Sequence, residues 1–292
     1  MKVMVLGASG QLGSETCAQL ENTNKIDVNK VNRIDLDLRK LDSVRIFLEA
    51  NPCEWLINCT GYHKTDEVEQ NTELGFLVNS FSVRELAKAC FEFGTKFIHI
   101  STDYVFGGDI NQKMPITELD RVLPINIYGA SKALGENFAL TFNPHNTYIL
   151  RVASLFGGNG SREKGGNFIQ TIINLAKSRD QIKVVNDQYM SPTYAKDVAV
   201  IIKLMIEKQP PAGTYHVVNT GSATWFDLAS YITDKLNLKF EVQPCTSEEF
   251  ITKAQRPSYS VLDNSKVLNT LHNIRDWKVA VNEYLSRESK YH

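Results

Sequence analysis

The segment YGASK places a tyrosine and a lysine four residues apart, at Tyr128 and Lys132. On an α-helix this spacing puts both side chains on one face, with the ammonium close to the phenol ring. A cation beside a phenol favours its ionised form, which helps a tyrosine to transfer a proton. A solvated helix face explains the same spacing, so the elements around the pair must decide its meaning.

A glycine-rich segment, GASGQLG at residues 7–13, directly follows an apolar run and opens an amphipathic stretch. Glycines let the backbone approach a pyrophosphate, whose charge is favoured by the exposed N–H groups of a helix N-terminus. An ordinary strand-to-helix turn is the alternative, but the βαβ pattern that follows favours a dinucleotide site. The cofactor-binding residues expected here are Gly7, Gly10, Gln11, Leu12 and Gly13.

The stretch VNKVNRIDLDL (residues 28–38) should carry the residues that distinguish NADPH from NADH. An acidic residue at the end of the second strand binds a ribose 2′-hydroxyl, whereas cations accommodate a 2′-phosphate. Asn32 stands about there between Lys30 and Arg33, which favours NADPH, although solvated loop charges are an equal alternative and NADH stays open. Asp35 or Asp37 could equally lie near the ribose. We expect cofactor contacts from Lys30, Arg33, Asp37 and Leu38.

Polar residues also end a later apolar run, in the segment HISTDYVFGG (residues 99–108). Its hydroxyls and carboxylate belong to Ser101, Thr102, Asp103 and Tyr104. In open α/β sheets the carboxyl ends of the strands form the ligand crevice, so these side chains are well placed for a substrate. The alternative is that they cap the next helix.

Apolar runs of strand length alternate with amphipathic stretches of helix length. The expected strands are KVMVLG, KIDVNKV, WLINCTG, KFIHIST, TYILRVAS and, much later, GTYHVVN. Such alternation predicts an α/β fold, a Rossmann-like doubly wound parallel sheet with helices on both faces. We place the dinucleotide-binding domain at residues 1–155 plus about 194–220, and a smaller C-terminal α+β substrate-binding lobe at about 156–193 plus 221–292.

Composition excludes several classes of protein. A net charge of −1 lacks the basic surface that nucleic-acid binding requires, so we expect no nucleic-acid partner. Five cysteines without CxxC spacing indicate a reducing, cytoplasmic location, and no apolar run is long enough to span a membrane. The histidines have no metal-ligand spacing, so no metal is expected. His99 and His216 lie in expected strands, where we expect them to pack.

Taken together, these motifs resemble the extended short-chain dehydrogenases/reductases, and within them the dTDP-4-dehydrorhamnose reductases. The segments that carry the resemblance are GxxGxxG, INCTGY, ISTDYVFGG, Tyr128-x-x-x-Lys132, DQYMSPTYAKD and RPSYSVLDNSK, from Lys2 to about Tyr284. The resemblance implies reduction of the C4 keto group of a nucleotide-linked 6-deoxyhexose by NADPH or NADH. The substrate implied is dTDP-4-dehydro-L-rhamnose, with a reductase for another nucleotide keto-sugar as the alternative.

The resemblance also implies roles for single residues. Tyr128 would donate a proton to the C4 oxygen, Lys132 would lower the pKa of Tyr128 and hold the nicotinamide ribose, and Thr102 would bind the C4 oxygen. The segment expected beneath the cofactor is Thr60, Gly61 and Tyr62. The residues expected at the substrate are Asp103, Tyr104, Ser154, Asn167 and Arg256, the last two at the diphosphate. For Arg256 a surface ion pair is the alternative.

Three departures from the family pattern fall where the substrate wall is expected. Ser154, in RVASLF, replaces a tryptophan that family members commonly carry, and Met190 beside Tyr189 replaces a glycine in DQYMSPT. His63 and Lys64 replace smaller residues after CTGY. The chemistry is therefore more firmly indicated than the sugar.

A non-catalytic alternative comes from relatives that keep the cofactor site but act as regulatory subunits, as the β subunit of methionine adenosyltransferase does. The complete set of Thr102, Tyr128 and Lys132 favours an enzyme. Epimerisation is not expected, because Tyr104 stands where related epimerase-reductases carry a cysteine. Some relatives form metal-bridged dimers, so a homodimer stays open, without a clear ligand cluster for the metal.

Overall fold

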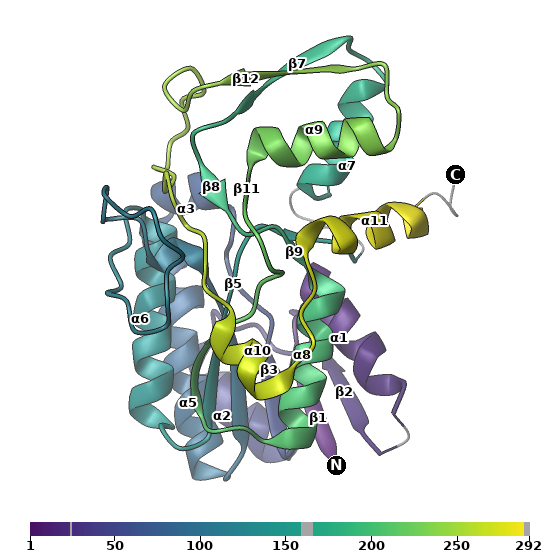
Figure 1. Ribbon diagram of the computed structural model, residues 1–292. Helices are drawn as coiled ribbons and strands as arrows, with labels where there is room; N and C mark the ends of the chain where they lie inside the picture. Colours follow the sequence, from purple (N-terminus) through teal and green to yellow (C-terminus); the bar gives the residue numbers. More distant parts are fainter. Residues whose placement is uncertain (24, 159–165, 289–292) are drawn as a thin grey trace.

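A central parallel sheet organises the protein, for which we use a computed structural model that describes residues 1–23, 25–158 and 166–288. Six strands form the sheet in the order β10-β5-β4-β3-β1-β2, and neighbouring strands pair in parallel. Their bounds are β1 Lys2–Leu6, β2 Asp27–Val31, β3 Trp55–Asn58, β4 Lys96–Thr102, β5 Thr147–Val152 and β10 Gly213–His216. Figure 1 shows helices on both faces of this sheet, so the expected doubly wound α/β fold is confirmed.

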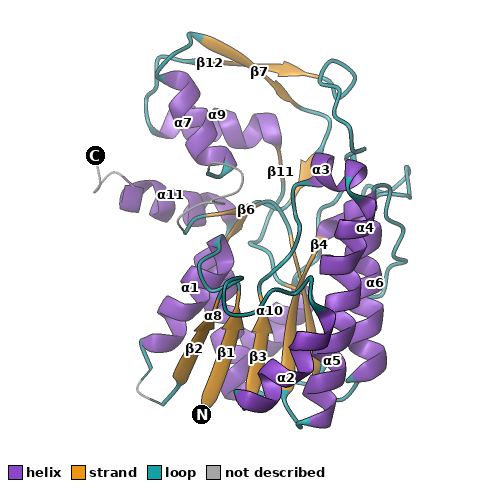
Figure 2. Cartoon of the chain, turned by 180° about the vertical axis from the view of Figure 1, so that it is seen from behind, coloured by secondary structure: helices purple, strands orange, loops and turns teal. Residues whose placement is uncertain are grey.

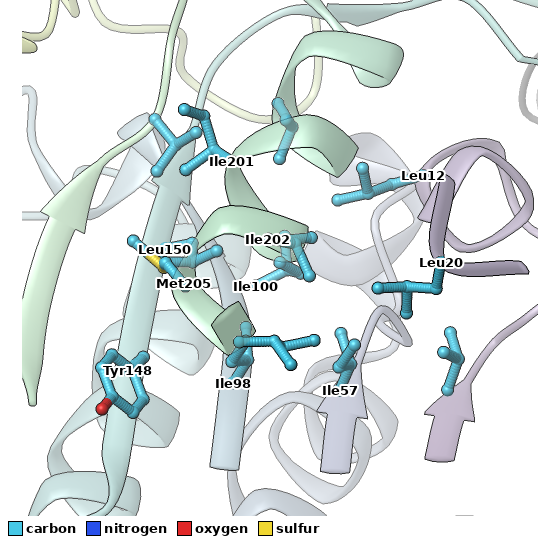
Figure 3. Packing of buried hydrophobic residues seen from close by; sticks show 14 of the residues in the cluster. Leu12, Leu20, Ile57, Ile98, Ile100, Tyr148, Leu150, Ile201, Ile202 and Met205 are labelled. Carbon is cyan, nitrogen blue, oxygen red and sulfur yellow. The ribbon is translucent and has the colours of Figure 1, made fainter. Parts of the chain in front are cut away.

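Each face of the sheet has its own core. On one face α1, α8 and α10 pack against alternate strand residues, in the cluster drawn in Figure 3 with Leu12, Ile57 and Ile202. On the other face α2, α5 and α6 cover the remaining residues, Met4 and Leu6 among them. Burial on both faces explains why β1, β3 and β5 read as apolar runs, whereas the edge strand β2 is largely exposed. The helix bounds are α1 Gln11–Glu21, α2 Leu41–Ala50, α5 Ser82–Glu92, α6 Ile127–Phe142, α8 Ala195–Lys208 and α10 Ser265–Leu271.

A chain of short helices connects β3 to α5. It includes a π-helix, η1, a geometry that often occurs at functional sites. The bounds are α3 Thr65–Gln70, α4 Thr72–Phe76 and η1 Leu77–Phe81, and a single 3₁₀ turn, η2 Asp103–Val105, follows β4.

A second core lies beyond the carboxyl ends of the central strands, where α7 and α9 pack together near α11 (Figure 2). A parallel pair of strands, β7 and β12, joins it. The remaining elements are β6 Leu155–Phe156, α7 Phe168–Ala176, β7 Gln181–Val185, β8 Tyr189–Met190, β9 Thr193–Tyr194, β11 Ala223–Thr224, α9 Trp225–Lys235, β12 Glu241–Cys245 and α11 Trp277–Glu288.

The division of the chain into two lobes remains our proposal. Two contacts support assigning residues 194–220 to the first lobe: β10 pairs with β5 at the edge of the central sheet, and α8 packs against α1. Within the described residues, none of the helices is sufficiently long and apolar to cross a membrane.

Candidate active site

The glycine turn after β1 is shaped for close backbone packing. Gly7 has φ of 74°, which favours glycine, and a Cβ on Gly13 would lie 2.1 Å from the Gly7 carbonyl oxygen. Gly10 precedes α1 and offers no side chain to cap it. The first N–H groups of α1 therefore stay available to an anion such as a pyrophosphate.

Two residues expected beside the cofactor have buried side chains. Leu12 packs in the core under α1, and Leu38 packs in the core of the opposite face. Gln11 donates from Nε2 to the Leu155 carbonyl oxygen at 3.1 Å, which ties the turn to β6. Leu12 and Leu38 can therefore serve a cofactor through their backbone groups, whereas their side chains stabilise the fold.

The end of β2 lies beside the glycine turn, as expected. Asn32 accepts a hydrogen bond from the Ser9 N–H at 2.9 Å. The structure does not bring Lys30 to this place, which corrects the sequence expectation. Lys30 forms an ion pair with Glu21, the last residue of α1, at 2.7 Å, so its ammonium lies at the helix end opposite Gly10. Side chains along a strand alternate between the two faces of the sheet, and Lys30 points to the face that α1 covers. The sequence position of Lys30 does not tell which face that is.

Arginines supply the positive charge beyond β2. Arg39 donates from Nε to both carboxylate oxygens of Asp37 at 2.9 Å. These hydrogen bonds, with the nearby charge of Arg33, lower the pKa of Asp37 to about 2. Arg33 is exposed, as a residue that meets a 2′-phosphate must be. Arg39 was not among the residues expected from the sequence.

Two asparagines, Asn58 within the INCTGY segment and Asn79, hold the loop after β3, and neither was among the site residues expected from the sequence. Asn58 accepts a hydrogen bond from the Thr60 N–H at 3.0 Å. Asn79, in η1, accepts from the Tyr62 N–H at 2.8 Å and donates to the Tyr62 carbonyl oxygen at 3.0 Å. Gly61 lies between these anchors. The segment expected beneath the cofactor is thus fixed through its backbone.

At the end of β4, Asp103 is buried among hydroxyl groups. Thr102 donates to one carboxylate oxygen at 3.0 Å and Ser260 to the other at 2.6 Å. Burial raises the pKa of Asp103 to about 6, although both hydrogen bonds lower it. Thr102 also caps η2, because its Oγ1 accepts from the Tyr104 N–H at 3.2 Å. Thr102 therefore caps the next turn, which was the alternative role expected from the sequence. It also lies at the end of β4, beside the site.

Helix α6 brings Tyr128 to this strand end. Asn126 caps the helix by accepting from the Gly129 N–H at 2.7 Å. The ring of Tyr128 meets the ring of Tyr104 edge to face, with centroids 5.9 Å apart. Burial raises the pKa of Tyr128 above its ordinary value, while its interaction with the Thr102 side chain lowers it. This corrects the expectation of a lowered pKa, because burial outweighs the favourable contacts in the protein without cofactor.

Lys132 is buried one turn further along α6. Its Nζ donates to the Ile100 carbonyl oxygen at 2.6 Å and lies 3.2 Å from His99 Nε2. Burial lowers the pKa of Lys132 to about 8, against the charge of Glu136, which raises it. The sequence indicated only a packing role for His99, and the structure adds this direct contact with the lysine.

A small hollow opens beside Asp103 and Tyr104. It is also lined by Ser154 and Met190, at which the sequence departs from the family pattern, and by Tyr189 beside Met190. Ser154 has φ of 43°, an uncommon conformation for a residue other than glycine. The remaining lining residues are Gln188, Trp225, Pro257 and Ser260, so within the described chain His63 and Lys64 do not line this hollow.

The two residues expected at a diphosphate have other partners. Asn167 caps α7: its oxygen accepts from the Gln170 N–H at 3.1 Å and its nitrogen donates to Tyr284 at 3.0 Å. Both polar atoms thus contribute to the fold, and the contact of Asn167 with a substrate diphosphate stays a prediction. Arg256 forms an ion pair with Asp66 at 2.8 Å, which agrees with the ion pair that was the alternative to a substrate contact.

Within the described residues, no group of three or more His, Cys, Asp or Glu side chains is placed to hold a metal ion. The site therefore consists of a glycine turn, a buried lysine, and hydroxyl and carboxyl groups at neighbouring strand ends. Such a set can bind a dinucleotide and exchange a proton with a bound ligand.

The family model of the RmlD substrate binding domain matches residues 1–290 of the chain. The chain belongs to this family. Among curated members, the dTDP-4-dehydrorhamnose reductase of Escherichia coli is 33% identical over 98% of this chain and 97% of that protein. The spore coat polysaccharide biosynthesis protein SpsK of Bacillus subtilis is 34% identical over 99% of this chain and 98% of that protein.

Solved structures of the RmlD family have the same fold. A dTDP-4-dehydrorhamnose reductase of Clostridium acetobutylicum, 38% identical, superposes with a TM-score of 0.91 over 99% of this chain and 100% of that one. That of Bacillus anthracis, solved in complex with NADP, is 35% identical, with a TM-score of 0.90 over 98% of this chain and 99% of that one.

Proposed function

We propose that the protein reduces the C4 keto group of a dTDP-linked 6-deoxyhexose with NADPH, and that the substrate is dTDP-4-dehydro-L-rhamnose. The observation that carries this is the convergence of Thr102, Tyr128 and Lys132 beside the glycine turn, in a chain of the reductase family. NADH is the second candidate cofactor.

The residues of the turn fit a nicotinamide dinucleotide. The open N-terminus of α1 would hold the pyrophosphate, and Arg33 with Arg39 would meet a 2′-phosphate. Thr60, Gly61 and Tyr62 would lie beneath the dinucleotide, and Lys132 would bind the nicotinamide ribose. When bound, the reduced nicotinamide supplies the hydride that the reduction needs.

Tyr128 supplies the proton in this proposal. A carbonyl oxygen that gains negative charge during reduction is stabilised by hydroxyl donors that already point at it. The buried Tyr128 keeps its proton at neutral pH because its pKa is raised, so the hydroxyl is available as the acid. Thr102 is the second donor: its single hydroxyl hydrogen, which Asp103 accepts in the structure, would turn from Asp103 to the C4 oxygen.

One observation at the substrate wall favours a second candidate for the sugar. Ser154 and Met190 line the hollow in place of a tryptophan and a glycine of the family pattern, and Trp225 lines it from α9. A differently shaped wall selects a different ring. A relative from Streptomyces niveus, 33% identical over 96% of this chain, is named a dTDP-4-keto-6-deoxy-D-glucose reductase. Another dTDP-linked keto-sugar is therefore the second candidate.

The relatives from Escherichia coli, Streptomyces niveus and Bacillus subtilis carry the names of reductases or of a biosynthetic protein, which favours an enzyme over a regulatory subunit. We also propose that the protein acts in the cytoplasm, where its free cysteines stay reduced, and that it can form a homodimer.

The test follows the absorbance of NADPH, and separately of NADH, when purified protein is mixed with enzymatically generated dTDP-4-dehydro-L-rhamnose. Loss of a general acid lowers turnover by roughly 10²–10⁴-fold, so we expect this loss in Tyr128→Phe with unchanged cofactor affinity. Near-normal turnover in that variant would refute the role of Tyr128. Oxidation only with dTDP-4-keto-6-deoxy-D-glucose would favour the second candidate.

A further inference from the structure

The backbone N–H of Thr60 determines which groups donate and which accept in the hydrogen bonds that lead to Lys132. The backbone N–H of Thr60 can only donate, and it points at Asn58 Oδ1 at 3.0 Å. The Thr60 hydroxyl contacts the same oxygen. The Asn58 amide is therefore oriented with its oxygen toward Thr60, and its NH₂ group faces His99 Nδ1 at 3.2 Å. An NH₂ group cannot accept a hydrogen bond, so His99 Nδ1 must be the acceptor.

This assignment determines the proton on the other ring nitrogen. A neutral imidazole carries one proton, and with Nδ1 bare the proton is on Nε2. His99 is completely buried, and burial holds the pKa of His99 well below its usual value, so the ring is neutral. The Nε2–H group then points at Lys132 Nζ, 3.2 Å away.

An ammonium group has no lone pair, so a charged Lys132 would place two N–H groups against each other. A neutral amine removes the conflict, because it accepts from His99 and still donates to the Ile100 carbonyl oxygen at 2.6 Å. We propose that Asn58 locks His99 in the Nε2–H tautomer and that His99 in turn positions Lys132 and favours its neutral form in the cofactor-free protein. His99 is thus a positioning residue rather than a packing residue.

The other groups around Lys132 do not reverse this polarity. Glu136, one turn along α6, favours the ammonium, but its carboxylate is already bound by Arg151 at 2.7 Å. Cys59, in the loop after β3, has a pKa raised to about 12 by burial and is a neutral thiol at physiological pH. Burial lowers the pKa of Lys132 to about 8 although Glu136 and Cys59 raise it, and a hydrogen-bond donor at His99 acts in the same direction as burial.

His216 provides an internal control with the opposite outcome. Its Nε2 faces the Arg151 guanidinium at 3.4 Å, and a guanidinium only donates. Its Nδ1 faces the Ile116 carbonyl oxygen at 3.0 Å, which only accepts. These two partners therefore give His216 the Nδ1–H tautomer. Burial lowers the pKa of His216 to about 3, so this ring is also neutral.

The test is ¹⁵N NMR of the full-length protein labelled at histidine, without added cofactor, because bare and protonated ring nitrogens have separate chemical shifts. His99→Phe and His216→Phe assign the two signals. We expect a bare Nδ1 in His99 and a bare Nε2 in His216. An Nδ1–H tautomer or a doubly protonated ring at His99 would overturn the proposal. This result is independent of whether the protein reduces any sugar.

Asn58→Asp should reverse the polarity, because a carboxylate accepts from His99 Nδ1–H. With lysine labelled at Cε and Lys132→Met for assignment, we expect Lys132 to titrate at or below about pH 8 in the wild type and higher in Asn58→Asp. Asn79→Asp adds the same charge, but the amide of Asn79 contacts Tyr62 and Ser131 and not His99. The tautomer of His99 should therefore be the same in Asn79→Asp as in the wild type. A wild-type midpoint near that of surface lysines would refute the proposal.

A consequence for turnover rests on the proposed function. If charged Lys132 is the active form, turnover falls as pH rises through the pKa of Lys132, and Asn58→Asp moves this fall to higher pH. If turnover falls at the same pH in Asn58→Asp as in the wild type while the NMR result holds, the assigned role of Lys132 in turnover is refuted. The proposed directions of the hydrogen bonds would not be affected.

Discussion

The backbone of Gly129 lies directly against the carbonyl group of Tyr104. A Cβ at position 129 would be 2.0 Å from the Tyr104 carbonyl oxygen, so only glycine allows this approach. Through it, α6 meets the turn after β4, and the rings of Tyr104 and Tyr128 come into contact. The glycine within YGASK thus decides where the tyrosine lies.

Gly129→Ala should therefore displace the first turn of α6. Overpacking costs about 1–3 kcal/mol, and we expect a loss of that size in the free energy of unfolding, with turnover reduced at least tenfold. Urea unfolding and initial rates measure the two effects. Gly61→Ala is the matched control for unfolding, since its Cβ would lie 3.5 Å from Asn79 Oδ1, an ordinary contact. Equal stability of the two variants would contradict the close approach.

Asp103→Asn should stabilise the protein in a pH-dependent way. The pKa of Asp103 is raised by burial to about 6 in the folded state, against about 3.9 when unfolded. A raised pKa stabilises the fold below pH 4, and this contribution is lost as pH rises through 6. The non-ionising variant should thus gain about 3 kcal/mol over the wild type at pH 8 and little at pH 4. Urea unfolding at both values measures this; a pH-independent difference would contradict it.

Arg256→Ala should weaken binding of the nucleotide sugar. In the structure its guanidinium is held by Asp66, a carboxylate that a substrate diphosphate would have to replace. We expect the KM for the sugar to rise at least tenfold, with the KM for NADPH unchanged. Asp66→Asn, which can still accept from the Ala254 N–H, should lower the KM for the sugar. Unchanged KM values in both variants would remove Arg256 from the substrate site.

The preference for NADPH should depend on Arg33 and not on Lys30. Arg33 is exposed near Asp37, whereas Lys30 is paired with Glu21 at the far end of α1. Arg33→Ala should raise the KM for NADPH several-fold and leave that for NADH unchanged, because only NADPH carries the 2′-phosphate. Lys30→Ala is the control and should change neither. If instead Lys30→Ala raised the KM for NADPH and Arg33→Ala did not, Lys30 would be the residue that meets the 2′-phosphate.

The sequence by itself determined the local features of this protein. Continuous apolar runs specified strands buried on both faces, the spacing of Gly7, Gly10 and Gly13 specified a tight strand-to-helix turn, and Tyr128 and Lys132 shared a helix face. Each of these depends on neighbouring residues, whose geometry follows from the backbone period.

Tertiary structure decided which distant groups meet. Asp66 and Arg256 are separated by 190 positions in the sequence. The separation is 157 positions for Asp103 and Ser260, and 33 positions for His99 and Lys132. Sequence spacing does not say which polar group will fill a buried hydrogen bond, because many groups of the same chemistry are available and only packing selects one. For this reason Tyr128 and Lys132 could be proposed as catalytic residues from a motif, whereas the groups that contact them became visible only in the fold.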